Sequence, residues 1–173
     1  MNPYNFTLLF FSFCGFFTGL LVLLKRRDRI GKSYFIFMFF VTSWSIAWSI
    51  LLSDNISYEV ALFCSRLAHS SGVIVGVTWY HLTLILSKRY EQKKKRLMIF
   101  YFVSVLIDLF AFTSFFVPGV IPRLEFTHYT VAGPLLDLAN ILYNIEVVLG
   151  FIELFKAIKL SDSKNERIQY KGF

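Results

Sequence analysis

The chain has 173 residues, of which 56% are hydrophobic and 21 are Phe, and a soluble domain of this length could not bury so much apolar surface in one core. The formal net charge is +7, yet the basic residues occur in short blocks between apolar runs rather than across one folded face, which excludes a nucleic-acid-binding domain. The chain is therefore an integral membrane protein, and the lipid bilayer is one of its partners.

The two cysteines, Cys14 and Cys64, each lie in an apolar run, so neither a disulfide framework nor a thiolate metal site is expected. The first apolar run is followed by the basic block Lys25, Arg26 and Arg27, whereas a signal peptide carries its positive charges before the apolar core. We expect this run to stay in the mature protein as a membrane anchor.

Five apolar segments are long enough to cross a bilayer, and all five should be helices because lipid offers the backbone no hydrogen-bond partner. They are residues 6–24, 34–52, 60–87, 97–117 and 135–158. The sequence therefore predicts an all-α fold, a polytopic membrane helix bundle with five transmembrane helices. No low-complexity linker divides the chain, so residues 1–173 are expected to form a single membrane-embedded domain.

The basic residues predict how the bundle is oriented. Of the 18 Lys and Arg residues, only Arg66 and Arg123 lie outside three clusters at residues 25–32, 88–96 and 156–171. These clusters fall on one side of the predicted bundle, and the positive-inside rule then places the N-terminus outside and the C-terminus in the cytoplasm.

Five residues of the second and third spans are predicted to pack helices together. Trp44 and Trp48 lie one turn apart, and the mid-span position of Trp44 favours packing over a place in an interfacial aromatic belt. Ala68, Gly72 and Gly76 recur at four-residue spacing, which allows a neighbouring helix to approach closely. We expect the third span to be the central helix of the bundle.

The third span also contains Arg66, His69 and His81, which should face protein or water because a charge at membrane depth is costly. For Arg66 we expect an acidic partner on another span, either Glu146 or Asp108, unless the side chain snorkels to the outer interface. His81 is more often a packing histidine than a ligand, since its neutral form readily hydrogen-bonds across helices.

The connection 118–134 is the longest outward one, and its alternating middle predicts a short hairpin over the bundle, either a lid or a simple ordered turn. The outer ends of the third and fifth spans bring polar residues to similar depth below it. A candidate ligand-binding pocket follows, formed by Arg66, His69, Asp137 and Asn140 and capped by Phe126 and Tyr129. The alternative is that these polar groups satisfy one another and leave no cavity.

The fifth span is polar on two sides, with Asp137, Asn140 and Asn144 on one face and Glu146 and Glu153 on the other. Intramembrane acids suggest function, but an ion pair or a protonated, hydrogen-bonded carboxyl would explain Glu146 equally well. The predicted intramembrane polar network consists of Arg66, His81, Asp108, Asn144 and Glu146.

Motifs of known enzymes are absent from the sequence, including phosphate-binding glycine loops, zinc-protease motifs and nucleophile elbows. Three histidines, two of them far apart on one helix, do not make a convincing metal site. We expect no catalytic residue, no metal and no cofactor.

Several short motifs follow one another in a recognisable order. They are Trp44, Arg66-Leu67, Tyr80-His81, Ala132-Gly133-Pro134 and Arg167-Ile168-Gln169-Tyr170. Together they resemble the N-terminal seven-helix region of bacterial histidine kinases, which typically shows a mid-helix Trp, an Arg-Leu pair and a Tyr/Phe-His pair ahead of a basic loop. The resemblance covers nearly the whole chain.

The resemblance implies a sensory input module of a two-component system in the bacterial cytoplasmic membrane, working with a cytoplasmic signalling domain. A small-molecule or outer-surface ligand is implied, and a homodimer is left open. The chain ends about where a sixth span would begin, so we expect it to lack the last two helices and the output domain. The alternative function is a small transporter or channel with a polar intramembrane path, and a third is a structural subunit that only binds partner helices.

Overall fold

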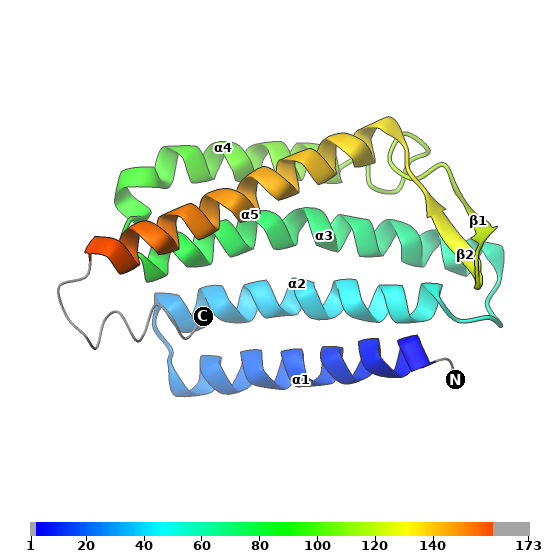
Figure 1. Cartoon of the computed structure of the whole chain (residues 1–173), viewed down its shortest axis with the longest axis horizontal. Coiled ribbons are helices and arrows are strands. Elements are labelled where there is room, and N and C mark those ends of the chain that lie inside the picture. The colour runs from blue at the N-terminus through cyan, green and yellow to red at the C-terminus, as the bar shows by residue number, and fades with distance from the viewer. Residues whose placement is uncertain (1–2, 161–173) are drawn as a thin grey trace.

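The computed structural model describes residues 3–160, which form a bundle of five helices and one β-hairpin (Figure 1). The elements in chain order are α1 (Pro3–Lys25), α2 (Arg29–Leu51), α3 (Tyr58–Leu86), α4 (Tyr90–Asp108), β1 (Gly119–Arg123), β2 (Phe126–Val131) and α5 (Pro134–Leu160). Within this range, the four helices α1, α2, α3 and α5 are long and apolar enough to cross a membrane. The predicted membrane helix bundle is confirmed, but four helices among the described residues are of this kind where five were predicted, because α4 is short and begins with charged residues.

The bundle has two chemically different ends, which Figure 1 shows at its left and right. The basic end consists of the connections 26–28 and 87–89 and the last turns of α5. The hairpin end consists of the connection 52–57 and the antiparallel β1–β2 hairpin, in which Gly119 pairs with Val131 and Arg123 with Phe126. The hairpin predicted over the bundle is therefore present. Of the residues used in the sequence predictions, Lys164, Lys171 and the motif 167–170 lie outside the described part of the chain.

Polar residues fix where two of the helices begin. The Asp28 carboxylate accepts a hydrogen bond from the Gly31 amide at 3.0 Å and caps α2, and Ser57 caps α3 by accepting from the Val60 amide. The hydrogen bond from Gly31 and the one from the Arg26 side chain lower the pKa of Asp28. Both caps satisfy backbone donors that a helix start leaves unpaired.

The fourth span differs from the prediction of residues 97–117. Helix α4 begins at Tyr90, so its first two turns contain the basic residues Lys93, Lys94 and Lys95. It ends at Asp108, and the apolar residues 109–117 form turns instead of helix. These turns are stabilised by packing, because Phe116 and Val117 are fully buried in a core that also contains residues of α3 and α5.

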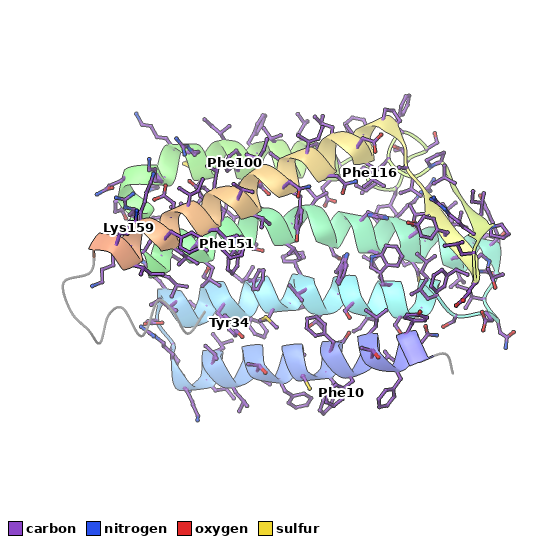
Figure 2. The ribbon with its side chains drawn as sticks, in the orientation of Figure 1. Phe10, Tyr34, Phe100, Phe116, Phe151 and Lys159 are labelled. Atoms are coloured by element: carbon purple, nitrogen blue, oxygen red, sulfur yellow. The ribbon has the colours of Figure 1, made fainter. Side chains whose placement is uncertain are left out.

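Helix α3 is the centre of the bundle, as predicted, because it contacts α2, α4, α5 and both strands. Helix α1 lies at the edge and packs on α2, where Gly15 and Gly19 lie against Met38. Large apolar side chains cover the outer side of α1; Figure 2 shows Phe10 directed away from α2, and this residue is 61% exposed. Such a surface suits contact with lipid rather than water.

Candidate functional site

A cavity lies between α2, α3 and α5. It has a volume of about 440 Å³, and its walls are mostly apolar and aromatic, with Phe37, Val41 and Trp44 from α2, Val73 from α3 and Tyr143 from α5 among them. A pocket of this size and composition is typical of sites for small molecules. We call this space the inner hollow.

A second space, the outer hollow, adjoins the inner hollow at the hairpin end. It has a volume of about 410 Å³ and is lined by both strands of the hairpin and by the outer parts of α2, α3 and α5. The two hollows share four lining residues, which are Trp48, His69, Leu136 and Asn140. The two hollows are therefore neighbours at the hairpin end of the bundle.

Hydrogen bonds attach the hairpin to α3 at the junction of the two hollows. The Thr130 hydroxyl of β2 lies 2.6 Å from the Ser65 hydroxyl and 3.3 Å from Nε2 of His69. The His69 ring in turn meets Trp48 edge to face, with ring centroids 5.6 Å apart. Thr130 is thus the polar contact through which hairpin and α3 hold each other in place.

The structure brings together three of the six residues predicted for a pocket. His69, Asn140 and Tyr129 line the outer hollow, whereas the other three lie elsewhere. Asp137 is solvent-exposed in the first turn of α5. Phe126 contacts Tyr4 of α1 at a centroid distance of 5.7 Å.

Arg66 is directed away from the hollows, and its expected acidic partner is replaced by a backbone carbonyl. Its Nε and Nη2 atoms donate to the Val117 carbonyl at 3.2 and 3.0 Å. That carbonyl is free to accept because residues 109–117 are not helical. A guanidinium that donates twice to one acceptor is held firmly without a salt bridge, so the prediction of Glu146 or Asp108 as partner was wrong.

The five residues predicted as one polar network form separate contacts in the described residues. Nδ1 of His81 lies 2.9 Å from the Tyr101 hydroxyl, and the Asn144 side chain donates to the Asn140 carbonyl within α5. Asp108 faces Ser70. Separate hydrogen bonds, two of them between helices and one within α5, therefore replace a single continuous path.

Glu146 is the most buried of these groups and lies where α3, α4 and α5 meet. Its side chain is fully buried, and Oε1 accepts a hydrogen bond from Ser104 at 3.3 Å. A Cβ atom at Gly76 would overlap Oε2 of Glu146 and would lie 3.0 Å from the ring of Tyr143. Gly76 thus provides the space that Glu146 occupies, which explains the close approach of α3 and α5.

The predicted packing residues serve different neighbours. Gly72 faces α2, since a Cβ there would lie 3.6 Å from Cδ1 of Trp44, in ordinary contact. Gly76 faces α5, and Ala68 is fully buried. Trp44 and Trp48 line the inner hollow in addition to packing on α3. The ridge of small residues is therefore tight toward α5 and loose toward α2.

An ion pair at the basic end was not predicted from the sequence. Nη1 of Arg89 donates to Oε2 of Glu153 at 2.9 Å, and the two side chains are 24% and 2% exposed. The pair connects the α3–α4 turn to α5. Glu153 lies two turns after Glu146 on a face of α5 that is polar in the sequence. This spacing was the signal from which a buried partner for Glu153 could have been predicted.

Two further contacts that were missed come from α4. Tyr101 and Ser104 bind His81 and Glu146, and with Asp108 they follow the spacing of one helix face within an otherwise apolar run. This i, i+3, i+7 pattern in the sequence was the signal for a buried polar face.

A comparison with protein families gives one match, to the model of the N-terminal 7TM region of histidine kinase, over residues 7–171. Neither the curated proteins nor the solved structures that were searched contain a match to the chain. The matched residues include both hollows and the Arg89–Glu153 pair.

Proposed function

We propose a signalling route for this chain, which belongs to the family of the N-terminal 7TM region of histidine kinase and is therefore a multi-pass sensory membrane module. This region is an input module, and full-length proteins of the family combine it with a cytoplasmic signalling domain. The proposed route begins with a ligand in the two hollows, continues along α3, and ends at the basic end of the bundle.

The observation that carries the proposal is that one helix takes part in every step. Helix α3 contributes His69, Gly72 and Val73 to the inner hollow. One turn further on, Gly76 packs against Glu146 of α5. A ligand that fills the hollow on one side of α3 favours one packing arrangement of the helix over another, which is how binding shifts a population.

The proposed signalling route along α3 ends at the turn between α3 and α4. Arg89 in this turn is paired with Glu153 of α5, so a shift of α3 changes the position of α5, the last described helix before the C-terminal residues. With the basic end in the cytoplasm, this is the side on which a signalling domain or a second copy of the module would read the change. The bacterial cytoplasmic membrane is the proposed location.

The test fills the inner hollow with a side chain of the protein itself, in place of a ligand. Replacing Gly72 by Leu adds a side chain where a Cβ makes only ordinary contact with Trp44, so the variant imitates an occupied hollow. Spin labels at the exposed positions Lys94 and Lys156, in a chain with Cys14→Ser and Cys64→Ala, report the distance between α4 and α5 at the basic end. In lipid nanodiscs, Gly72→Leu should shift this distance by about 1–2 Å, the scale of helix shifts in switching proteins.

The control is Thr18→Leu, which places the same side chain at an exposed position of α1. This variant should leave the distance distribution unchanged. If both variants give the distribution of the parent, while circular dichroism shows both to be folded, the proposed route along α3 is wrong.

A further inference from the structure

The inner hollow is elongated along the bundle. On α2 its lining extends from Trp48 to Phe37, eleven residues, or about 16 Å at the rise of an α-helix. Its walls along this length are Phe, Val, Trp, Leu, Ala and Tyr side chains with one Gly, and its polar lining residues, His69 and Asn140, also line the outer hollow. A long apolar space suits an extended hydrocarbon chain better than a compact polar molecule.

The outer hollow differs by one positive charge in an otherwise mostly apolar lining. Arg123 lines it and lies 5.0 Å from the centroid of the Tyr129 ring. Arg123 is exposed, and it has no carboxylate partner among residues 3–160. Arg66, the other base outside the basic clusters, is already occupied by the Val117 carbonyl.

Acidic residues do not line either hollow in the described part of the chain. The acids of the hairpin end lie outside both linings: Asp54 is beside Thr127, Glu59 is in the first turn of α3, and Glu125 in the hairpin turn and Asp137 on α5 are exposed. The mouth, whose walls are mostly apolar, thus carries one positive charge without a carboxylate partner among the described residues, and Thr130 and Asn140 are polar members of the same lining. A guanidinium without a carboxylate partner favours an anionic group.

We propose that the two hollows bind a single-chain amphiphile with an acidic head group, its chain in the inner hollow and its head beside Arg123. This inference rests on the proposed sensory role of the cavity and specifies the ligand class. Two sources supply such chemistry, a free single-chain acid and one chain of an anionic membrane phospholipid. We commit to the free acid as the ligand, and the phospholipid is an outcome that the experiment distinguishes.

The experiment uses the tryptophans as reporters. Trp44 and Trp48 line the inner hollow, whereas the third, Trp79, packs between Phe37 and Phe151. The full chain in phosphatidylcholine nanodiscs is titrated with dodecanoic acid brominated at mid-chain, since bromine quenches tryptophan fluorescence at short range. We expect saturable quenching that excess unbrominated dodecanoic acid reverses. The variant Trp44→Phe/Trp48→Phe should lose this component and keep only the non-saturable quenching from lipid.

The head group is tested by comparing ligands and variants. The mid-chain-brominated dodecanol, which has the same chain and no charge, should bind more weakly than the acid. Arg123→Gln should weaken binding of the acid by about fivefold, the factor that corresponds to an exposed ion pair of about 1 kcal/mol, and should not change binding of the alcohol. Lys94→Gln, at the basic end, is the matched control and should bind the acid like the parent. Both substituted side chains are exposed, so both variants should fold.

Three outcomes overturn the proposal. Equal saturable quenching by acid and alcohol, unchanged in Arg123→Gln, would show that the head group is not recognised. Equal or stronger saturable quenching by brominated phosphatidylglycerol would assign the site to a membrane lipid. If none of the three brominated ligands, the acid, the alcohol and the phosphatidylglycerol, gives saturable quenching, the inner hollow is not a binding site for a hydrocarbon chain.

These outcomes are separable from the proposed signalling route. Binding of the acid without any change in the Lys94–Lys156 label distance would contradict the route and leave the ligand class standing. If Gly72→Leu changes the label distance but the parent chain does not bind the acid, only the ligand class is contradicted.

Discussion

The two halves of α3 are packed in opposite ways. Toward the hairpin end, α3 borders the two hollows, and Gly72 leaves room between α3 and Trp44 of α2. Toward the basic end, Gly76 admits the carboxylate of Glu146, and the Arg89–Glu153 pair closes the contact with α5. We call the half beside the hollows the loose end, because of the space between Gly72 and Trp44, and the half packed on α5 the firm end. Hydrogen bonds of Ser65 and Arg66 still anchor the loose end, so α3 can respond to occupancy of the hollow without losing its fold.

The largest effect is expected at the firm end, from Arg89→Met. This change leaves the Glu153 carboxylate buried without its cation, and breaking a buried pair is strongly destabilising. We expect a loss of about 3 kcal/mol in the free energy of unfolding, at the lower end of the range for buried pairs because Arg89 keeps some exposure. Unfolding in mixed detergent micelles, followed by circular dichroism, measures it.

An exposed ion pair at the same end serves as control. Arg29 and Glu91 are 3.8 Å apart, with side chains 79% and 75% exposed, so Arg29→Met should change the unfolding free energy by less than about 1 kcal/mol. The double variant Arg89→Met/Glu153→Leu should regain most of the loss, since it leaves no unpaired charge. Equal losses in Arg89→Met and Arg29→Met would show that the firm end does not depend on this pair.

A second prediction compares the two glycines directly. Gly76→Ala forces a Cβ against Glu146 and Tyr143, and overpacking of this kind costs about 1–3 kcal/mol. Gly72→Ala adds the same methyl group at ordinary contact distance from Trp44. It should change the unfolding free energy by less than about 0.5 kcal/mol. The same unfolding assay applies, and equal costs at the two positions would contradict the contrast between the two halves of α3.

A loss smaller than those of Arg89→Met and Gly76→Ala is expected from Thr130→Val at the loose end. The change removes the hydroxyl shared by Ser65 and His69 and should cost about 1 kcal/mol, the value of an ordinary hydrogen bond. The effect should be local, so hydrogen exchange of the β1 and β2 amides is the measurement, with faster exchange expected there and unchanged exchange in α4. Thr127→Val, exposed at the hairpin tip, should leave exchange as in the parent protein.

Much of the fold followed from hydropathy and charge. The third span was predicted at residues 60–87 and is found at Tyr58–Leu86, because a long apolar run bordered by polar turns leaves little freedom in its limits. The fourth span was misplaced for a physical reason. Lysines are good helix formers, so the basic block lies inside α4. It marks the point where the helix passes from water to the apolar part of the bundle, and not the start of the helix.

The same stretch explains why the site was only partly predictable. Hydropathy does not distinguish apolar residues that face lipid from those that pack in the protein, and Phe116 and Val117 do the latter. The turn that contains them leaves a backbone carbonyl free to accept from Arg66. Every residue has such a carbonyl, so the sequence does not show which one is available as an acceptor. His69 and Asn140 could be placed in the pocket because α3 and α5 were correctly predicted.

The unequal composition of α4 has a consequence for how the protein is made. Its first turns are charged, and its apolar residues 97–108 are fewer than the roughly 20 needed to cross a bilayer unaided. When α4 leaves the ribosome, Glu146 of α5, the acceptor for its Ser104 hydroxyl, has not yet left it. We expect α4 to wait at the membrane surface and to enter the bilayer together with α5, which makes insertion of this half of the molecule a cooperative, late step of biosynthesis.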